Sequence, residues 1–426
     1  MSQNKKTIVI IGLGYVGLPL ACLAAEKGYR VLGHALDEKK IAMINAGKSP
    51  IDDPLLNEWL SRVSITASAD PAIITEGDIV ISCVPTPVDR SHTPDLGPVR
   101  DSMEKVRAHM RDGQLIVLES TINPGVSEEV VLPILERDGK KVGKDFYLAH
   151  CPERINPGDP KWNVRNIPRV VGGFDAASLR RAKEFYESII EAEIHPMKSL
   201  KEAEAVKIVE NSFRDVNIAF VNELAKSFDI LGIDILDVIE GAKTKPFSFM
   251  AHYPSAGIGG HCIPVDPYYL IERAKQSGFT HEFLQLARDI NNSMPAYTVG
   301  KLLRLMNAAG KAVKGSTVGL LGIAYKANID DDRESPFYKI QDELKELGAS
   351  VESFDPHLPK KGTASSLKEL LKKSDALVLV TDHKEFMELT PNLLKENNIL
   401  AFVDGKNVLD KDAMIDAGIH YSGIGR

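Results

Sequence analysis

The chain of 426 residues is long enough for roughly two to four domains with hydrophobic cores of their own. Its 43% hydrophobic and 26% charged residues exclude a disordered chain, and the formal net charge of −7 argues against a nucleic-acid-binding protein. Four cysteines lie far apart, without a Cys-x-x-Cys pair or a histidine at metal-ligand spacing, so we expect neither a disulfide framework nor a metal site.

The uncharged stretch Thr7–Ala25 has the hydropathy of a signal peptide or a short membrane span. Gly12, Gly14 and Gly17, followed by Pro19, suit a strand, a tight turn and a helix start better than a continuous apolar helix. We therefore expect a soluble, cytoplasmic protein that binds neither membrane nor nucleic acid.

Short β-branched runs alternate with amphipathic helical patterns over the first 200 residues. This alternation predicts a doubly wound parallel sheet. Five runs are expected to be its strands: Thr7–Ile11, Arg30–Leu32, Ile79–Ser82, Leu115–Leu118 and Tyr147–Ala149.

A long helix is predicted over Lys201–Leu231, which contains neither Gly nor Pro and has apolar residues at helical spacing. Helical patterns continue to about Ala309, interrupted by the Pro- and Gly-rich stretch Thr244–Tyr268. The strand rhythm then returns in four runs: Thr317–Ile323, Ser350–Phe354, Ala376–Thr381 and Ile399–Val403.

The predicted fold class is therefore α/β, with two Rossmann-like, doubly wound parallel-sheet domains joined by a helical middle domain that contains the long helix. We expect these domains to cover residues 1–200, 201–312 and 313–426.

The first expected strand runs into a Gly-x-Gly-x-x-Gly turn. Gly12 would permit the tight turn, Gly14 would let the backbone approach a pyrophosphate, and Gly17 would let the helix pack on the strand. The helix N-terminus offers N–H groups and a positive dipole to phosphates. We predict a dinucleotide site here that includes Gly12, Gly14, Tyr15, Val16 and Gly17.

An acidic residue that binds the ribose hydroxyls is expected roughly 20 residues after such a turn. Asp37 is the only candidate, and it is equally suited to cap a helix that starts at Glu38. No arginine follows this strand to receive a 2′-phosphate, so the sequence favours NAD over NADP.

Cys262 stands in the run Gly-Ile-Gly-Gly-His-Cys-Ile-Pro-Val-Asp-Pro-Tyr-Tyr, which covers Gly257–Tyr269. The glycines allow the backbone to come close to a ligand, and Asp266 follows the cysteine by four residues. Such a position can expose a thiolate near a helix start. The alternative is a buried structural cysteine.

This run resembles the active-site loop of the UDP-sugar 6-dehydrogenases, the family of the UDP-glucose and UDP-N-acetylhexosamine dehydrogenases. The resemblance implies an NAD domain, a helical middle that forms a homodimer or higher homo-oligomer, a UDP-binding C-terminal domain and a role in polysaccharide biosynthesis. It covers nearly the whole chain and includes Val84–Pro87, Glu119–Thr121, Cys151–Arg154, Lys207 with Asn211, Gly322–Lys326, Asp331–Pro336 and Asp404–Asn407.

The chemistry that the resemblance implies is the oxidation of the sugar's C6 hydroxyl to a carboxylate, with two NAD reduced. Cys262 would add to the aldehyde and carry a thiohemiacetal and then a thioester, because a soft nucleophile that is also a good leaving group suits every step. Lys207 and Asn211, one helical turn apart, would stabilise the oxyanions of these adducts.

Three more residues match catalytic positions of the family. Asp266 and Thr121 would order the hydrolytic water and transfer protons, and Glu153 is a candidate general base. Their alternatives are a helix cap for Asp266, a turn hydroxyl for Thr121 and a surface carboxylate for Glu153.

Lys326 and Arg333 match positions where a cation near the UDP diphosphate is expected. For Arg333 the alternative is an ion pair with Asp330, Asp331 or Asp332. The resemblance further implies that Thr86 contacts NAD and that the following residues contact the sugar nucleotide: Glu153, Arg154, Ile155, Lys207, Asn211, Gly259 and Lys406. Relatives often carry Arg at the last of these positions, and Lys cannot provide the same bidentate contact.

Departures from the family pattern bear on the cofactor and the substrate. Ala35 stands where relatives usually have their ribose acid, which puts tight NAD binding in doubt. His261 and Val265 replace the serine and lysine usual in UDP-glucose dehydrogenases, and so indicate the N-acetylhexosamine branch. The runs Thr244–Phe247 and Glu153–Gly158 resemble the UDP-N-acetylglucosamine members more than the UDP-N-acetylmannosamine members.

We therefore expect a UDP-N-acetylglucosamine 6-dehydrogenase, with UDP-N-acetylmannosamine and UDP-glucose as alternative substrates. Two other classes stay open. A non-catalytic UDP-sugar sensor would have no reason to hold Cys262, Lys207, Asn211 and Asp266 together. A two-electron hydroxyacid dehydrogenase would need neither the cysteine nor the second α/β domain.

Overall fold

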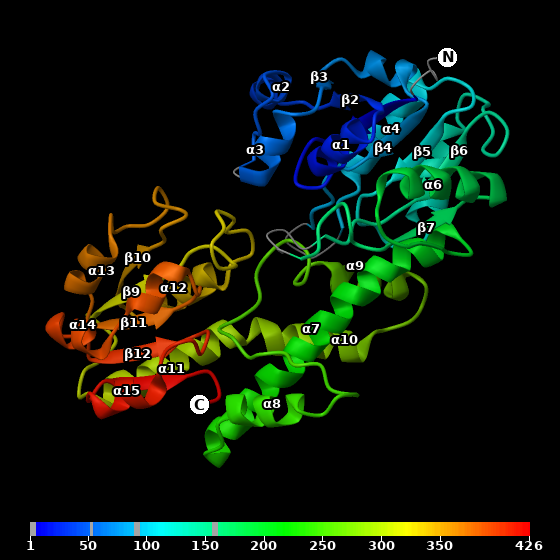
Figure 1. Ribbon diagram of the computed structural model, residues 1–426. Helices are drawn as coiled ribbons and strands as arrows, with labels where there is room; N and C mark the ends of the chain where they lie inside the picture. The colour runs from blue at the N-terminus through cyan, green and yellow to red at the C-terminus, as the bar shows by residue number, and fades with distance from the viewer. Residues whose placement is uncertain (1–5, 52–53, 89–93, 156–160) are drawn as a thin grey trace. The chain divides into compact units, whose positions relative to one another are not determined.

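The computed structural model describes residues 6–51, 54–88, 94–155 and 161–426. The chain divides into two compact units, seen in Figure 1. The N-terminal unit comprises residues 1–210 and 268–279, and the C-terminal unit comprises residues 211–267 and 280–426. The three domain boundaries expected from the sequence stay a prediction.

An eight-stranded sheet forms the centre of the N-terminal unit. Its strands are parallel except for the antiparallel pair β6–β7, which involves a strand that was not predicted; the predicted doubly wound parallel sheet is confirmed. In spatial order the strands are β3 (Ile65–Ser68), β2 (Arg30–His34), β1 (Thr7–Ile11), β4 (Ile79–Ser82), β5 (Leu115–Leu118), β6 (Tyr147–His150), β7 (Arg169–Gly173) and β8 (Ile194–Pro196).

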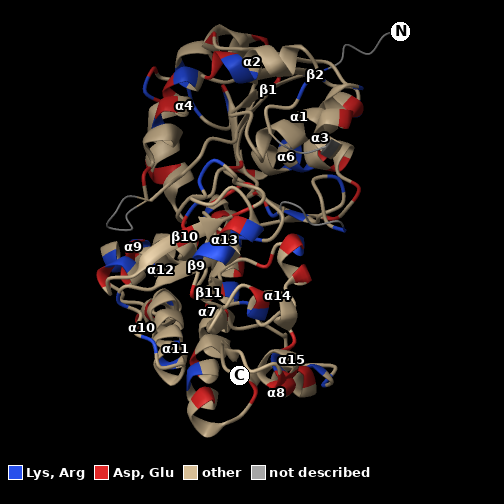
Figure 2. Cartoon of the chain, turned by 90° about the vertical axis from the view of Figure 1, so that its left-hand side faces the viewer, with Lys and Arg blue, Asp and Glu red and all other residues tan. Residues whose placement is uncertain are grey.

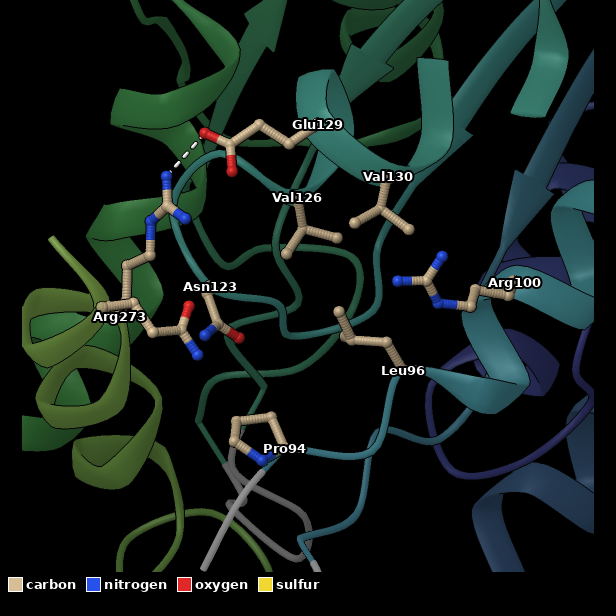
Figure 3. Close-up of a pocket in the computed structure, with 9 residues that line it drawn as sticks. Pro94, Leu96, Arg100, Asn123, Val126, Glu129, Val130 and Arg273 are labelled. Atoms are coloured by element: carbon tan, nitrogen blue, oxygen red, sulfur yellow. Dashed lines mark hydrogen bonds and ion pairs between the residues drawn. The ribbon is translucent and has the colours of Figure 1, made fainter. Parts of the chain in front are cut away.

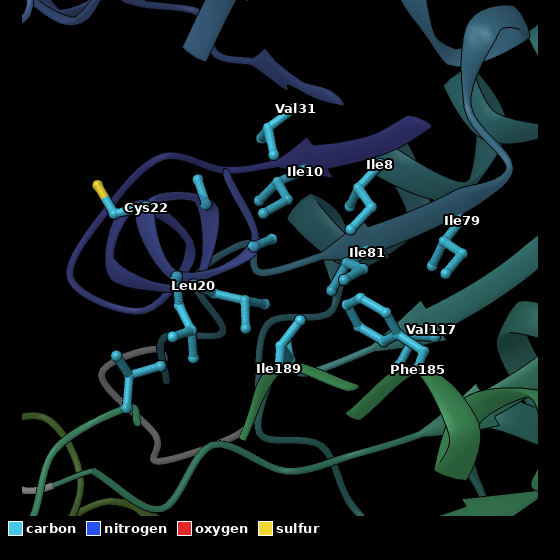
Figure 4. Packing of buried hydrophobic residues seen from close by; sticks show 14 of the residues in the cluster. Ile8, Ile10, Leu20, Cys22, Val31, Ile79, Ile81, Val117, Phe185 and Ile189 are labelled. Atoms are coloured by element: carbon cyan, nitrogen blue, oxygen red, sulfur yellow. The ribbon is translucent and has the colours of Figure 1, made fainter. Parts of the chain in front are cut away.

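Helices cover both faces of this sheet, as expected for buried parallel strands. On one face, Ile8 and Ile10 of β1 and Ile81 of β4 pack with Leu20 of α1 and Phe185 of α6 (Figure 4). The helical segments of this unit are α1 (Gly17–Glu26), α2 (Glu38–Asn45), α3 (Pro54–Leu60), η1 (Pro71–Glu76), α4 (Gly97–His109), η2 (Ser127–Val131), α5 (Leu132–Leu135) and α6 (Ala176–Ile189).

The C-terminal unit contains a second, fully parallel sheet. The strand order is β10 (Ser350–Phe354), β9 (Thr317–Leu321), β11 (Ala376–Leu379), β12 (Ala401–Asp404) and β13 (His420–Gly423). Apolar clusters on both faces bury these strands, so this unit is also doubly wound. Its helical segments include α8 (Ile235–Lys243), α10 (Glu282–Asn292), α11 (Met294–Ala308), α12 (Pro336–Glu346), α13 (Leu367–Lys373), η3 (Lys384–Glu388), α14 (Pro391–Glu396) and α15 (Lys411–Asp416).

The predicted long helix is α7 (Leu200–Leu231), which continues from the N-terminal into the C-terminal unit. The end of the Pro- and Gly-rich stretch leads into α9 (Asp266–Gln276). Along α7, the side chains of Val209, Phe213 and Phe220 are 55%, 51% and 54% exposed. These three residues form an exposed apolar stripe on a helix that buries other apolar residues, such as Ile208 and Val221.

Charge is mixed along the helices that Figure 2 shows. Both basic and acidic residues occur, for example, on α4 and α13 (Figure 2). The uncharged segment near the N-terminus forms β1 and α1. In the part of the chain that the structure describes, we find no helix with both the length and the apolar character needed to cross a membrane.

Candidate active site

The glycines after β1 have the geometry that a pyrophosphate needs. Gly12 has φ +96°, and a Cβ there would lie 2.7 Å from the carbonyl oxygen of Cys83. A Cβ on Gly17 would lie 2.0 Å from the Gly12 carbonyl oxygen, so α1 starts in direct contact with the turn. Nothing lies within 4 Å of the Cβ position of Gly14, which leaves room for a ligand against the backbone. These residues fit a dinucleotide.

Further cofactor candidates lie where the parallel strands end. Val16 precedes α1 as its N-cap and makes no side-chain cap bond. Tyr15, in the same turn, is 48% exposed. Thr86 follows β4, and its carbonyl accepts a hydrogen bond from the hydroxyl of Tyr269. Thr121 follows β5 and is partly exposed. The carboxyl ends of β1, β4 and β5 therefore carry the candidates, as expected for a doubly wound sheet.

Asp37 caps α2. Its Oδ1 accepts hydrogen bonds from the backbone N–H groups of Lys39, at 2.9 Å, and Lys40, at 3.2 Å. The capping alternative is thus observed, whereas the ribose contact stays a prediction. The two roles are compatible, because a carboxylate has further acceptor positions.

Substituting Asp37 separates these roles. If its carboxylate also holds the ribose, both Asp37→Ala and Asp37→Ser should raise the KM for NAD about tenfold, because a charge-assisted hydrogen bond is lost. Serine caps a helix nearly as well as aspartate, so a pure cap predicts a normal KM for NAD in Asp37→Ser. Ala35→Asp should lower this KM. Steady-state kinetics with the sugar nucleotide saturating would give these values, and its own KM is expected to stay unchanged.

A buried ion cluster includes Glu153, the first residue of the predicted substrate motif. Arg169, at the start of β7, is completely buried. Its Nη2 lies 2.7 Å from Glu153 Oε2, and its Nη1 lies 3.1 Å from Glu119 Oε2. The hydroxyl of Tyr186 donates to Glu119 Oε1 at 2.6 Å. Burial raises the pKa of Glu119, and the charge of Arg169 offsets part of this rise.

Glu153 anchors the backbone of this loop. Its Oε1 accepts hydrogen bonds from the N–H groups of Arg154 and Ile155, both at 2.6 Å. Glu153 is 6% exposed, so the alternative of a surface carboxylate is wrong. Arg154 forms an ion pair with Glu210 of α7 and donates to the carbonyl of Pro168. The loop is therefore held at both residues, and residues 156–158 of the predicted motif lie outside the described residues.

Cys262 lies in the C-terminal unit on a turn that leads into α9. Its carbonyl accepts hydrogen bonds from the N–H groups of Val265, at 3.1 Å, and Asp266, at 2.8 Å. Cys262 is partly exposed, whereas Cys22 and Cys151 are buried. The alternative of a buried structural cysteine does not hold for Cys262. It precedes the first residue of α9 by four positions.

Two predicted catalytic residues contact each other: Asp266, four residues after this cysteine, and Asn211 of α7. The Nδ2 of Asn211 donates a 2.5 Å hydrogen bond to Oδ2 of Asp266, which is 3% exposed. Lys207 is 9% exposed and lies one turn before Asn211 on α7. The structure thus confirms that Lys207 and Asn211 share a helix at i and i+4. It also fixes the amide of Asn211 against a buried carboxylate.

The glycine run before Cys262 packs under the loop between β9 and α12, residues 322–335. A Cβ on Gly259 would lie 2.6 Å from Cβ of Tyr325, and one on Gly260 would lie 2.8 Å from the ring of Tyr325. The Gly260 N–H donates to the Arg333 carbonyl at 2.9 Å. The small residues therefore bring the cysteine loop against the loop that carries Lys326.

A second C-terminal loop reaches the same stretch. The N–H of Ala256 donates to the carbonyl of Gly405 at 3.0 Å. Lys406 follows, partly buried, with its N–H bonded to Asp404 at 3.0 Å. Asn407 next to it has φ +58°. Two loops at the carboxyl edge of the second sheet thus lie on the cysteine loop, an arrangement that suits a ligand bound at that edge.

The guanidinium of Arg333 contacts Asp331. Its Nε and Nη2 lie 2.9 Å and 2.5 Å from the two carboxylate oxygens. The ion-pair alternative is thus observed, and a contact between Arg333 and a diphosphate stays a prediction.

The N-terminal unit also contains a cavity of about 250 Å³ that none of the candidate residues lines. Figure 3 shows Arg273 of α9 and Arg100 of α4 on opposite sides of it. Arg273 forms a 2.5 Å ion pair with Glu129. The remaining lining residues are Pro94, Leu96, Asn123, Val126, Val130 and Gln276. We assign this cavity no part in the reaction.

His357, His383 and Glu385 lie close enough together to hold a metal ion. Nδ1 of His383, however, accepts a hydrogen bond from the N–H of Asn328, and its Nε2 is bonded to Asp355. Both ring nitrogens are engaged, so we assign no metal to this group.

Sequence reasoning gave no role to Arg169 or His383. The available signals were an arginine that opens an apolar run and a histidine four residues after a buried strand. Both patterns are also common in purely structural settings, so neither identifies a site without tertiary contacts.

Comparison with known proteins places these features in a family. Three models of the UDP-glucose/GDP-mannose dehydrogenase family match the chain: the NAD binding domain over residues 6–190, the central domain over residues 201–293 and the UDP binding domain over residues 319–411.

Relatives and solved structures extend over nearly the whole chain. A UDP-N-acetyl-D-mannosamine dehydrogenase of Methanococcus maripaludis is 34% identical over all of this chain and 98% of the relative. A UDP-N-acetyl-D-glucosamine 6-dehydrogenase of Pseudomonas aeruginosa is 34% identical over 95% of this chain and 97% of the relative. The structure of a UDP-D-ManNAc dehydrogenase from Pyrococcus horikoshii superposes with a TM-score of 0.93, at 33% identity over 99% of each chain. This chain therefore belongs to the UDP-glucose/GDP-mannose dehydrogenase family and is an NAD-dependent UDP-sugar dehydrogenase.

Proposed function

We propose that this protein oxidises the C6 hydroxyl of a UDP-N-acetylhexosamine to the carboxylate in two successive steps. The observation that carries the proposal is the cysteine loop: Cys262 is partly exposed, Asp266 holds Asn211, and the loop packs against Tyr325 in the region matched by the UDP binding domain. A dehydrogenase that stops at the aldehyde needs no such nucleophile.

NAD, when bound, supplies the hydride acceptor for each oxidation. After the first oxidation, Sγ of Cys262 attacks the C6 aldehyde and forms a thiohemiacetal, whose oxygen takes up a proton. Loss of the second hydride and of that proton gives the thioester. Water then attacks the thioester carbon, the carbon–sulfur bond breaks, and the carboxylate and the thiol of Cys262 are released.

Asn211 and Lys207 are proposed to stabilise the oxyanions of the adducts. Asn211 has two amide N–H bonds, and the hydrogen bond to Asp266 uses one of them and fixes the plane of the other. Asp266 is the first residue of α9, and its side chain is buried. A carboxylate fixed in this way is suited to order the hydrolytic water. The roles of Lys207 and Thr121 rest on the family resemblance.

The configuration of the sugar at C2 is the finer question. The motifs 244–247 and 153–158 favour UDP-N-acetylglucosamine. The relative from Methanococcus maripaludis, named for the mannosamine epimer, is as similar to this chain as the relative from Pseudomonas aeruginosa named for glucosamine. UDP-N-acetylmannosamine is therefore the second candidate.

An assay of the three nucleotide sugars side by side tests the donor. UDP-N-acetylglucosamine should have a kcat/KM about ten- to a hundredfold above that of UDP-glucose, because a site that pairs the amide loses roughly 1–3 kcal/mol when that partner is missing. A preference for UDP-glucose would overturn the N-acetylhexosamine assignment. A preference for UDP-N-acetylmannosamine would overturn only the epimer.

A homodimer is part of the proposal. The exposed apolar stripe of Val209, Phe213 and Phe220 lies on the longest helix described and is of a kind that a second copy covers. Sedimentation equilibrium should give twice the mass of the chain, and Phe213→Glu should shift the protein toward the monomer. A monomeric wild-type protein at micromolar concentration would refute it.

A further inference from the structure

We propose that His383 is a positioning residue of the sugar-nucleotide site. Its imidazole holds the β9–α12 loop, residues 322–335, in the conformation that binds the nucleotide. This inference rests on the proposed function, because the loop acquires its importance from UDP-sugar binding. His383 lies four residues after the end of β11, and its two ring nitrogens are bonded to Asn328 and Asp355.

The two hydrogen bonds of His383 define the tautomer of its imidazole ring. Nδ1 lies 2.9 Å from the backbone nitrogen of Asn328, and Nε2 lies 3.0 Å from Oδ2 of Asp355. A backbone N–H can only donate, so Nδ1 is the acceptor and Nε2 carries the proton. His383 and Asp355 are both fully buried, so water does not replace either bond.

Asp355 holds the start of the same loop. Its Oδ2 also accepts hydrogen bonds from the N–H groups of Ile323, at 2.6 Å, and Ala324, at 2.8 Å. Burial alone would raise the pKa of Asp355, but the hydrogen bonds from His383, Ala324 and Ile323 outweigh it and hold the pKa well below its usual range. The Asp355–His383 pair thus fixes the loop at residues 323–324 and again at residue 328.

The loop needs such a constraint at Asn328. This residue has φ +61°, in the left-handed region, which asparagine adopts more readily than other non-glycine residues but which surrounding contacts must still support. The Asn328 Oδ1 accepts a hydrogen bond from the Lys384 N–H at 3.1 Å, so the segment that carries His383 contacts Asn328 twice. Without Nδ1 of His383, the backbone N–H of Asn328 would lose its hydrogen-bond acceptor.

The part of the loop that is held in this way carries residues of the proposed substrate site. Tyr325 packs on Gly259 and Gly260 of the cysteine loop, and Lys326 is the candidate for the diphosphate. Both stand between the two anchored points of the loop. A shift of Asn328 therefore moves Lys326 and Tyr325, whereas Asn211 and Asp266 are held by their own hydrogen bond. Loss of the acceptor should weaken nucleotide binding much more than it slows the reaction of bound substrate.

Two substitutions separate the role of His383 as a hydrogen-bond acceptor from its role in packing. In His383→Asn, the amide oxygen stands near the position of Nδ1 and can accept the Asn328 N–H. In His383→Gln, the amide nitrogen stands near Nε2 and can donate to Asp355, but the Asn328 N–H loses its acceptor. Glutamine fills more of the imidazole volume than asparagine, so a role in packing alone predicts that His383→Asn is the more damaging change. Positioning through Nδ1 predicts the reverse order.

Titration of the full-length protein with UDP by calorimetry, together with steady-state kinetics, tests the proposal. His383→Gln should raise the Kd for UDP and the KM for the UDP-sugar about tenfold, with kcat and the KM for NAD within twofold. His383→Asn should stay within about threefold of wild type. His357→Gln is the matched control: this ring stacks on His383 at 4.7 Å, and its substitution should leave the Kd for UDP unchanged.

A Kd for UDP that is unchanged in His383→Gln, or a larger effect in His383→Asn than in His383→Gln, would overturn the proposal. If His383→Gln does not fold, Asn328→Ala provides the second test at an exposed residue. It removes the acceptor of the Lys384 N–H and leaves a Cβ without a local hydrogen bond at φ +61°, so it should shift the turn and raise the Kd for UDP severalfold, and an unchanged value would also overturn the proposal. A wild-type protein that does not bind UDP would instead refute the proposed function itself.

Discussion

Replacing Cys262 by serine should lower steady-state formation of the carboxylate by about 10³-fold or more, while UDP and NAD still bind. Serine retains the size and the turn, but its hydroxyl is a weaker nucleophile and a poorer leaving group than a thiolate, and both steps of the second half-reaction depend on these properties. Assays of acid product and calorimetric titration with UDP separate the two effects. Turnover near that of wild type in Cys262→Ser would rule out the covalent mechanism.

Cys22→Ala is the matched control for the loss of a thiol. Cys22 lies in the core of the N-terminal unit, and burial raises its pKa to about 12, so it stays a protonated thiol at neutral pH. Its removal should leave kcat within about twofold of wild type. Equal loss of turnover in both variants would mean that the effect of Cys262→Ser is not specific to the cysteine loop.

Replacing Arg169 by methionine should lower the free energy of unfolding by about 3–5 kcal/mol. Arg169 is fully buried between Glu119 and Glu153, which are 1% and 6% exposed. Methionine fills similar space but leaves two carboxylates close together without a compensating charge. Urea unfolding followed by circular dichroism measures the change.

Arg62→Met is the control for the same substitution at the surface. Arg62 forms an exposed ion pair with Glu58 at i and i+4 on the chain, and such pairs contribute little. The expected change is within about 0.5 kcal/mol. A destabilisation in Arg169→Met no larger than this would show that the buried ion cluster does not hold the N-terminal unit together.

Secondary structure was predictable where the local sequence pattern matched the burial of the segment in the folded protein. The runs that form β1, β4 and β5 are apolar, rich in β-branched residues and buried on both faces, and they were predicted with their observed ends. The strands β7 and β8 were missed, because one begins with Arg169 and the other has three residues ending in Pro196. Arg30 at the start of β2 is exposed, whereas the buried charge of Arg169 makes sense only when its partner, Glu119, is known from the fold.

The site was predictable as a set of residues and much less as a set of contacts. The spacing of Lys207 and Asn211 was enough to place them on one helix. The contact between Asn211 and Asp266 joins residues 55 positions apart in the sequence, and no local pattern implies it. For Asp37 and Arg333 the sequence left two roles open, and the structure shows the local one in each case.

The number of NADH molecules formed per sugar oxidised to completion tests the central claim most directly. Limiting UDP-N-acetylhexosamine, excess NAD and absorbance at the NADH band give this ratio, with the acid quantified by mass spectrometry. The account predicts two NADH and one carboxylate per sugar. One NADH per sugar with an aldehyde product, as from a two-electron dehydrogenase, or no NADH, as from a UDP-sugar sensor, would contradict it.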